Sequence, residues 1–121
     1  MKREILKEKC DLKALLSAAS PDQADRLAVF ALLNLGFVES LANGMISAAE
    51  AVNTFYYADN GLFVRKVLKD KAADQVMSRG VQPPDLFDCL PKEEAQREFL
   101  HELATMRSLC LKLMEGKRRV A

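Results

Sequence analysis

The fold is decided by residues 20–44, which read SPDQADRLAVFALLNLGFVESLANG. Serine, proline and glutamine at its start make a helix-initiation signal, because serine caps a helix and proline fits the first turn. Gly44 favours the left-handed conformation that ends helices. Between these signals, apolar residues follow the helical period on two faces. One face holds Ala24, Leu27, Ala28, Ala31, Leu35 and Val38, and the other holds Phe30, Leu33, Phe37 and Leu41.

A helix with two apolar faces is enclosed by its neighbours, so residues 21–43 are predicted to form the central helix of a bundle. The longest apolar run, residues 27–38, should then be covered on all sides within a compact monomer. It has 12 residues, whereas a membrane span needs about 20. We therefore expect no membrane segment.

Helical periodicity recurs along the rest of the chain, and no segment alternates as a strand would. Further helices are predicted over residues 4–18, 48–58, 62–79 and 91–115, the second of them opened by a capping box at Ser47 and Glu50. The fold class is thus all-α, a compact bundle of about five helices in a single domain spanning residues 1–121.

The connections between these helices carry their own signals. Asp59-Asn60-Gly61 is a turn tripeptide. Residues 81–84 should be extended, because Pro83 and Pro84 disfavour the helical conformation of the residues before them. A single isolated turn is predicted at 85–89, and residues 116–121 should form a short frayed tail.

Composition bounds the function. The 121 residues are 50% apolar and 29% charged, with 5 Gly and 4 Pro, which excludes a disordered or collagen-like chain. The net charge of +1 is too small for a dedicated phosphate-backbone binder. This net charge is the sum of segment charges that alternate in sign. They are +2, −4, +3, −4 and +4 over residues 1–20, 21–60, 61–80, 81–105 and 106–121. Helices of opposite sign either pair across the bundle or orient a partner.

The cysteines and the start of the chain indicate a cytoplasmic protein. Cys10, Cys89 and Cys110 are odd in number and lack paired spacing, as reduced thiols do. The first residues carry charge but no apolar region of a signal peptide.

No metal or cofactor is expected. The only histidine, His101, lies nine residues from Cys110 on one predicted helix, so the two side chains point in opposite directions. No phosphate-binding, dinucleotide-binding or nucleophile-elbow motif is present. Cys89, placed just before a predicted helix N-terminus, or an acidic cluster such as Glu98 and Glu102, leaves a small enzyme as a third hypothesis.

Aromatic residues gather around one predicted turn. The three consecutive aromatic residues at positions 55–57 would span about 200° on a helix, so they cannot all face the core. Either a tyrosine ring reaches the surface, or both tyrosines cover the core with their hydroxyls in water. We predict a soluble protein-interaction module without catalytic activity (an adaptor, a regulator or a self-associating subunit). It would bind another protein or a second copy of itself through Phe55, Tyr56, Tyr57, Phe63 and Arg65.

Basic residues support the main alternative, a nucleic-acid-associated regulator. Arg65, Lys66 and Lys69 fall within about 100° of arc on the predicted helix 62–79, where they could face phosphates. The tail adds Lys117, Arg118 and Arg119. Neighbouring aspartates at 70 and 74 favour a solvated basic face instead.

Overall fold

The computed structural model describes residues 8–19 and 21–115. These residues form seven α-helices and one π-helical segment, η1, and contain no β-strand, which confirms the all-α class. The elements are α1 (Leu12–Ala19), α2 (Gln23–Ala42), α3 (Ala48–Thr54), α4 (Ala58–Phe63), η1 (Val64–Leu68), α5 (Lys71–Val81), α6 (Pro83–Cys89) and α7 (Lys92–Met114). Among the described residues, no helix combines the length and hydrophobicity that crossing a bilayer requires.

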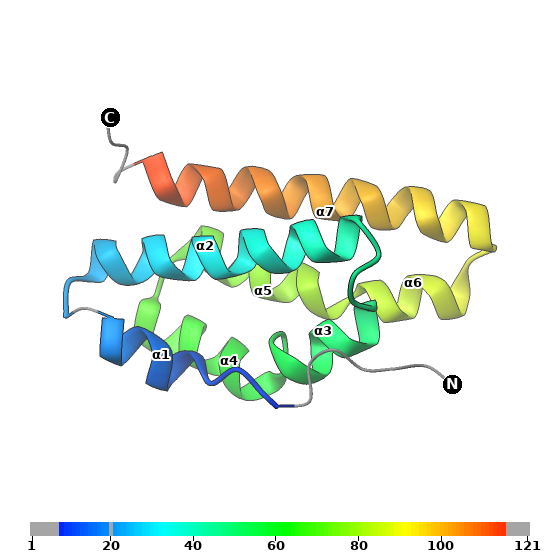
Figure 1. Cartoon of the computed structure of the whole chain (residues 1–121). Coiled ribbons are helices and arrows are strands. Elements are labelled where there is room, and N and C mark those ends of the chain that lie inside the picture. Colours follow the sequence, from blue (N-terminus) through cyan, green and yellow to red (C-terminus); the bar gives the residue numbers. More distant parts are fainter. Residues whose placement is uncertain (1–7, 20, 116–121) are drawn as a thin grey trace.

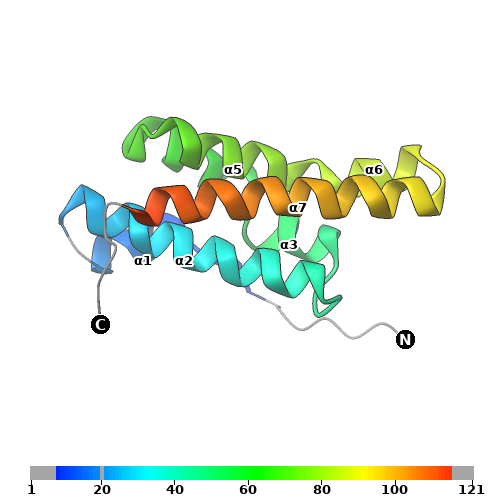
Figure 2. The same cartoon turned by 90° about the horizontal axis from the view of Figure 1, so that it is seen from above.

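The two longest helices, α2 and α7, lie side by side and antiparallel (Figure 1). Seen from above, α7 lies between α2 and the row formed by α5 and α6 (Figure 2). α2 contacts α1, α3, α5 and α7, as expected of the helix around which the bundle is arranged.

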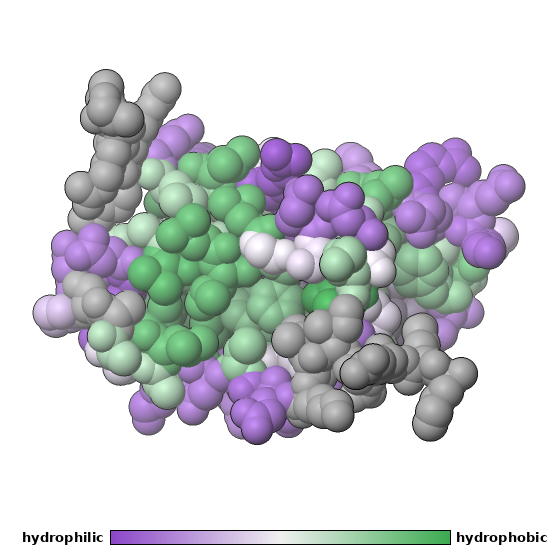
Figure 3. All heavy atoms as spheres, viewed as in Figure 1, coloured by the Kyte–Doolittle hydropathy of each residue, from purple (hydrophilic) through white to green (hydrophobic). Residues whose placement is uncertain are grey.

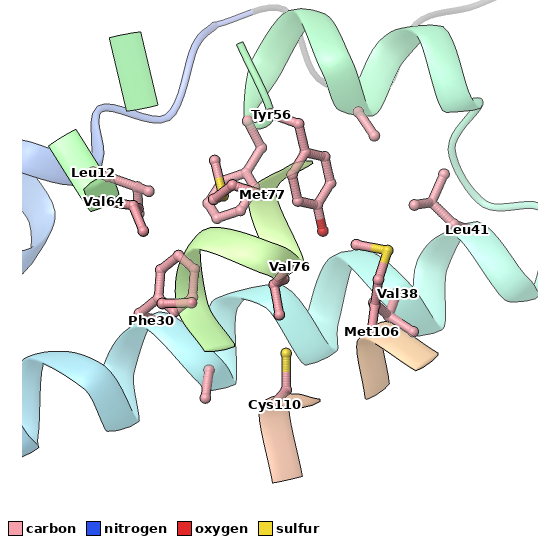
Figure 4. Close-up of a cluster of buried hydrophobic side chains, with 14 of the residues drawn as sticks. Leu12, Phe30, Val38, Leu41, Tyr56, Val64, Val76, Met77, Met106 and Cys110 are labelled. Atoms are coloured by element: carbon pink, nitrogen blue, oxygen red, sulfur yellow. The ribbon is translucent and has the colours of Figure 1, made fainter. Parts of the chain in front are cut away.

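The core lies between α2, α5 and α7, and α1, η1 and residues 55 and 56 add buried side chains to it (Figure 4). Each of its principal side chains is at most 5% exposed: Phe30, Val38 and Leu41 from α2, Val76 and Met77 from α5, and Met106 and Cys110 from α7.

The ends of α2 agree largely with the sequence signals. Gly44 adopts the left-handed conformation (φ +69°) just after α2 ends. At the start, the cap is Asp22, whose carboxylate accepts from the Ala24 backbone N–H at 3.1 Å. Ser20 lies outside the described residues. The predicted capping box of α3 is present, since the Glu50 N–H donates to the Ser47 hydroxyl at 3.0 Å.

The predicted enclosure of residues 27–38 is wrong on one side. Phe30, Ala31 and Val38 are buried, but Leu32 is 55% exposed and Gly36 is also exposed. The described part of the chain therefore covers α2 on its inner face and both flanks, and leaves a strip of its outer face open.

The predicted helix 48–58 and the turn at 59–61 are also wrong. α3 ends at Thr54, residues 55–57 form a break, and Asp59, Asn60 and Gly61 lie inside α4. The buried Asn60 explains the difference, because its side-chain amide donates to the carbonyls of Phe55 and Cys10, each at 2.8 Å, and its oxygen accepts from the Leu12 N–H at 3.1 Å. These tertiary hydrogen bonds outweigh the local preference of Asp-Asn-Gly for a turn.

The predicted helix 62–79 is interrupted at Lys69 and Asp70. The π-helical segment ends at Lys69, which takes the left-handed conformation (φ 50°), and Asp70 then caps α5 by accepting from the Ala73 N–H at 3.0 Å. At the break, the Leu68 carbonyl accepts from the Gln23 side chain at 2.6 Å. A contact with α2 therefore fixes a break that local sequence does not reveal.

The stretch predicted to be extended, residues 81–84, is almost entirely helical. α5 continues through Val81, and Pro83 and Pro84 occupy the first turn of α6. Proline is tolerated there because the first turn leaves its N–H groups unpaired within the helix. The isolated turn predicted at 85–89 is therefore part of a seven-residue helix.

The first helix begins later than the sequence predicts. α1 begins at Leu12, and Asp11 before it accepts from the Ala14 N–H at 3.2 Å, so residues 8–11 do not join the helix predicted over 4–18. Residues 1–7 and the predicted frayed tail 116–121 lie outside the described residues.

Gly80 makes a testable contact in the core. A Cβ at this position would overlap the ring of Tyr56, whereas a Cβ at Gly61 in α4 would meet nothing within 4 Å. Gly80→Ala should lower the free energy of unfolding by about 1–3 kcal/mol through overpacking. Gly61→Ala should leave it unchanged or raise it by about 0.5–1 kcal/mol. Urea denaturation followed by circular dichroism measures both, and equal effects would contradict the Tyr56 contact.

Candidate functional site

A cleft of about 470 Å³ lies between α4 and α5, and we call it the α4–α5 cleft. It collects residues from four elements and the break at 55–57: Val52, Tyr56, Tyr57, Ala58, Gly61, Leu62, Arg65, Asp74, Met77, Ser78 and Val81. Most of its lining is apolar, and its ionisable side chains besides the two tyrosines are Arg65 and Asp74. Of the five residues predicted for protein binding, the cleft brings together Tyr56, Tyr57 and Arg65.

Phe55 and Tyr56 belong to the core, which corrects their predicted place on a recognition surface. They are 0% and 1% exposed. The ring of Phe55 stacks on Phe37 with centroids 4.4 Å apart, and the Tyr56 ring meets Phe55 edge-on at 4.9 Å. The spacing argument assumed an unbroken helix, whereas the break turns both rings inward.

The hydroxyl of Tyr56 points into the core and finds no hydrogen-bond partner among the described residues (Figure 4). Burial is the main cause that raises the pKa of Tyr56, and the nearby Cys110 thiol adds to it. A buried hydroxyl without a partner costs about 1–3 kcal/mol. The Tyr56 side chain therefore contributes to packing, and its hydroxyl forms no hydrogen bond with the described residues.

Tyr57 is half-buried and holds the first described residues against α4. Its hydroxyl donates to the Cys10 carbonyl at 2.7 Å, and the Lys9 ammonium lies 4.7 Å from the centre of its ring. Burial, followed by the carboxylates of Asp11 and Asp59, raises the pKa of Tyr57. The remaining surface of its ring lines the α4–α5 cleft.

Phe63 and Arg65 differ in exposure. Phe63 is half-buried and packs against the core, outside the cleft lining. The Arg65 side chain is 64% exposed at the cleft rim, with Nε 3.4 Å from Asp74 Oδ1. By contrast, Arg79 and Glu102 form a less exposed pair at 2.9 Å that joins α5 to α7. The first pair is a surface feature, and the second stabilises the fold.

The basic residues of the alternative hypothesis do not share one helix. Arg65 and Lys66 are exposed on η1, whereas Lys69 is the left-handed residue that ends it. The continuous helical stripe predicted for these three residues is therefore wrong in its geometry. Lys117, Arg118 and Arg119 lie outside the described residues.

The residues considered for catalysis or metal binding remain apart. Cys89 is exposed in the last turn of α6, and not in the irregular segment predicted for it. His101 is exposed on α7, while Cys110 is buried. Glu98 is exposed, and Glu102 pairs with Arg79. Within residues 8–19 and 21–115, no group of three or more His, Cys, Asp or Glu could hold a metal ion.

Sequence reasoning missed the cleft rim formed by Leu62 and Val81, which are 45% and 48% exposed. Each lies near the boundary of a predicted element, and the two are 19 residues apart. The only available signal was that Leu62 and Val81 are apolar residues beside a glycine.

Comparison with family models, with curated proteins and with solved structures finds no significant match to this chain. What the protein does therefore has to be inferred from its own residues.

The adjacent tyrosines give a matched pair of substitutions. Tyr56→Phe removes an unsatisfied buried hydroxyl and should raise the free energy of unfolding by about 1 kcal/mol. Tyr57→Phe removes the hydrogen bond to the Cys10 carbonyl and should lower it by about 1 kcal/mol. Chemical denaturation of both variants tests whether the two changes in the free energy of unfolding have opposite signs. If Tyr56→Phe lowers this free energy, the Tyr56 hydroxyl makes a hydrogen bond and the assignment is wrong.

The three thiols should react in a fixed order. In the native protein at pH 8, Ellman's reagent should label the exposed Cys89 first and the half-buried Cys10 more slowly, because burial raises the pKa of Cys10. Burial raises the pKa of Cys110 to about 12, so this thiol should react only after unfolding. Peptide mapping of the labelled sites over time tests this order, and early labelling of Cys110 would contradict it.

Proposed function

We propose that this chain is a protein-interaction module that binds an apolar side chain of its partner in the α4–α5 cleft and has no catalytic role. The observation that supports the proposal best is an apolar cleft of about 470 Å³ with Leu62 and Val81 exposed at its rim. Exposed apolar side chains around a hollow are typical of sites that anchor a partner residue.

The interior of the cleft is suited to an apolar anchor. Met77 is buried and provides a flexible side chain that adapts to different shapes. Tyr57 presents a ring that is already held by its hydroxyl, so little conformational entropy is lost when a partner contacts it. The side chain of a leucine or phenylalanine on a partner helix would fit within this space.

The rim favours a partner that carries an acidic group beside its apolar anchor. Exposed ion pairs such as Arg65–Asp74 contribute only about 0–1 kcal/mol, so Arg65 can exchange partners at little cost. An arginine binds a carboxylate through two parallel hydrogen bonds. The proposed partner thus presents an acidic residue to Arg65 while its apolar side chain enters the cleft.

Two exposed valines provide the test. Val81 lines the cleft and is 48% exposed, whereas Val67 on η1 is 50% exposed and lies outside the cleft lining. In pull-downs from source-cell lysate, Val81→Asp should lose a partner that the wild type captures, because a carboxylate would enter the apolar space. Val67→Asp should retain that partner. Arg65→Glu should weaken capture by about tenfold, or about 1.4 kcal/mol.

Circular dichroism confirms that each variant is folded before the comparison. If Val81→Asp and Val67→Asp capture the same proteins in the same amounts, the α4–α5 cleft is not the binding site.

A nucleic-acid-associated role is the second candidate, because Arg65, Lys66 and Lys69 are all exposed. Asp70 and Asp74 lie among them at a shallow pocket that also contains Arg65 and Lys69, and their charge opposes a phosphate there. A salt-sensitive gel shift that disappears in a Lys66→Glu, Lys69→Glu double variant would favour this candidate over protein binding.

A further inference from the structure

The outer face of α2 differs from an ordinary solvated helix surface. From Leu27 to Val38 the helix carries no charged residue, although Leu32 is 55% exposed and Gly36 is open to solvent. A continuous hydrophobic area covers the left half of α2 in this view, and near-neutral residues lie over its right half (Figure 3). The water-facing side of a surface helix is normally polar, so this face has the character of an interface.

A groove of about 500 Å³ runs along this face, and we call it the α2 groove. Met45, which is 61% exposed, and Ile46 form one wall. The complete lining is Cys10, Leu32, Leu33, Gly36, Phe37, Ser40, Met45 and Ile46, in which Ser40 and Cys10 supply the only polar side-chain groups. The α2 groove shares no lining residue with the α4–α5 cleft.

Gly36 indicates what kind of group fits the groove. It lies within a 20-residue helix, where glycine is less favourable than alanine. A Cβ at this position would meet nothing within 4 Å, so packing among the described residues does not require glycine. The missing side chain lets another backbone approach α2 closely at this point.

We propose that the α2 groove is a self-association surface, on which α2 of a second copy of this chain packs antiparallel about a two-fold axis at Gly36. In a two-fold interface each residue meets the residue at the mirrored position of the partner. With the axis at Gly36, Leu32 lies opposite Ser40 and Val29 opposite Asn43, so these two apolar side chains meet uncharged ones, whereas Leu33 lies opposite Glu39 of the other copy.

The charges on α2 are compatible with this register. Arg26 and Glu39 flank the uncharged stretch and Asp25 precedes Arg26, and an axis at Gly36 places neither acid opposite an acid of the other copy. Glu39 is also held at the rim, since its Oε1 accepts from the Asn43 side chain at 3.0 Å. An axis at Leu32 would place Asp25 opposite Glu39, and like charges that meet at an interface are unfavourable.

A second copy suits the groove better than an unrelated partner. A partner for this uncharged face must itself present an uncharged surface, and α2 is such a surface. Homodimer interfaces are also more apolar than those of transient complexes. The net charge of +1 creates little repulsion between two copies.

The open face of α2 is long enough for helices of two copies to cross. From Ala28 to Ser40, α2 rises about 18 Å, and Met45 extends the apolar area to one side. A stable interface buries about 800 Å² on each partner, which is about one tenth of the 7971 Å² surface of this chain.

Light scattering coupled to size exclusion tests the proposal on the full chain. The wild type should be a dimer at about 100 µM, a concentration at which even micromolar interfaces are occupied. Leu32→Asp places a charge in the interface, and Gly36→Leu fills the crossing point from a Cβ that meets nothing within 4 Å in the monomer. Each should raise the dimer dissociation constant at least about tenfold. Leu100→Asp, at a leucine of α7 that is 45% exposed and outside the groove lining, is the matched control and should remain dimeric.

Cross-linking tests the two-fold register. In a Cys10→Ser, Cys89→Ser background, Gly36→Cys should form a covalent dimer under mild oxidation, because the two copies meet at this position. Ser40→Cys should not, since an antiparallel register separates the two positions by about 12 Å along the helices and a disulfide needs Cα atoms within about 7 Å.

Three results would overturn the proposal. The first is a wild type that remains monomeric at about 100 µM. This includes the case in which a dimer appears only after deletion of residues 1–7, because the groove would then be a site for that segment. The second is a dimer that resists both Leu32→Asp and Gly36→Leu. The third is equal cross-linking at positions 36 and 40, which indicates parallel helices. None of these results bears on the α4–α5 cleft, which is tested by Val81→Asp.

Discussion

The structure depends on the contact between the ring of Tyr56 and the backbone of α5 at Gly80. The ring occupies the space in which any other residue at position 80 would place its Cβ. To reach this position, the chain must leave the helical conformation between α3 and α4, and the side chain of Asn60 stabilises that break by donating to the Phe55 carbonyl. The α4–α5 cleft follows from this arrangement, because Tyr56 and Met77 are part of its lining.

The unpaired hydroxyl of Tyr56 is tolerated because the burial of its ring outweighs it. An aromatic side chain buries about 150–250 Å², which corresponds to roughly 4–6 kcal/mol at 25 cal/mol per Å². The hydroxyl without a partner costs about 1–3 kcal/mol. Packing therefore determines the orientation of this residue, and Phe55, which has no polar group to leave unpaired, faces inward beside it.

The sequence predicts features set by neighbours in the chain. The central helix, the capping box at Ser47 and the left-handed Gly44 all depend on residues within one or two turns. The break at 55–57 and the end of η1 at Lys69 depend on hydrogen bonds from Asn60 to Cys10 and from Gln23 to Leu68, across more than 40 residues. The cleft combines residues 52–81, and its shape follows from these breaks, so periodicity alone could not reveal it.

The division of α2 between core and surface follows from the lengths of the helices around it. α2 has 20 residues and extends about 30 Å, whereas α1, which covers one flank, has 8 residues and extends about 12 Å. Beyond α1, the described residues that line this flank of α2 are Cys10, Met45 and Ile46 in the α2 groove. The sequence shows that α2 is apolar on more than one side. This property alone does not tell whether the apolar sides are covered by other helices of the same molecule or by a second molecule. The short α1 leaves Leu32 exposed within one molecule, which is the condition that the proposed pairing of two copies requires.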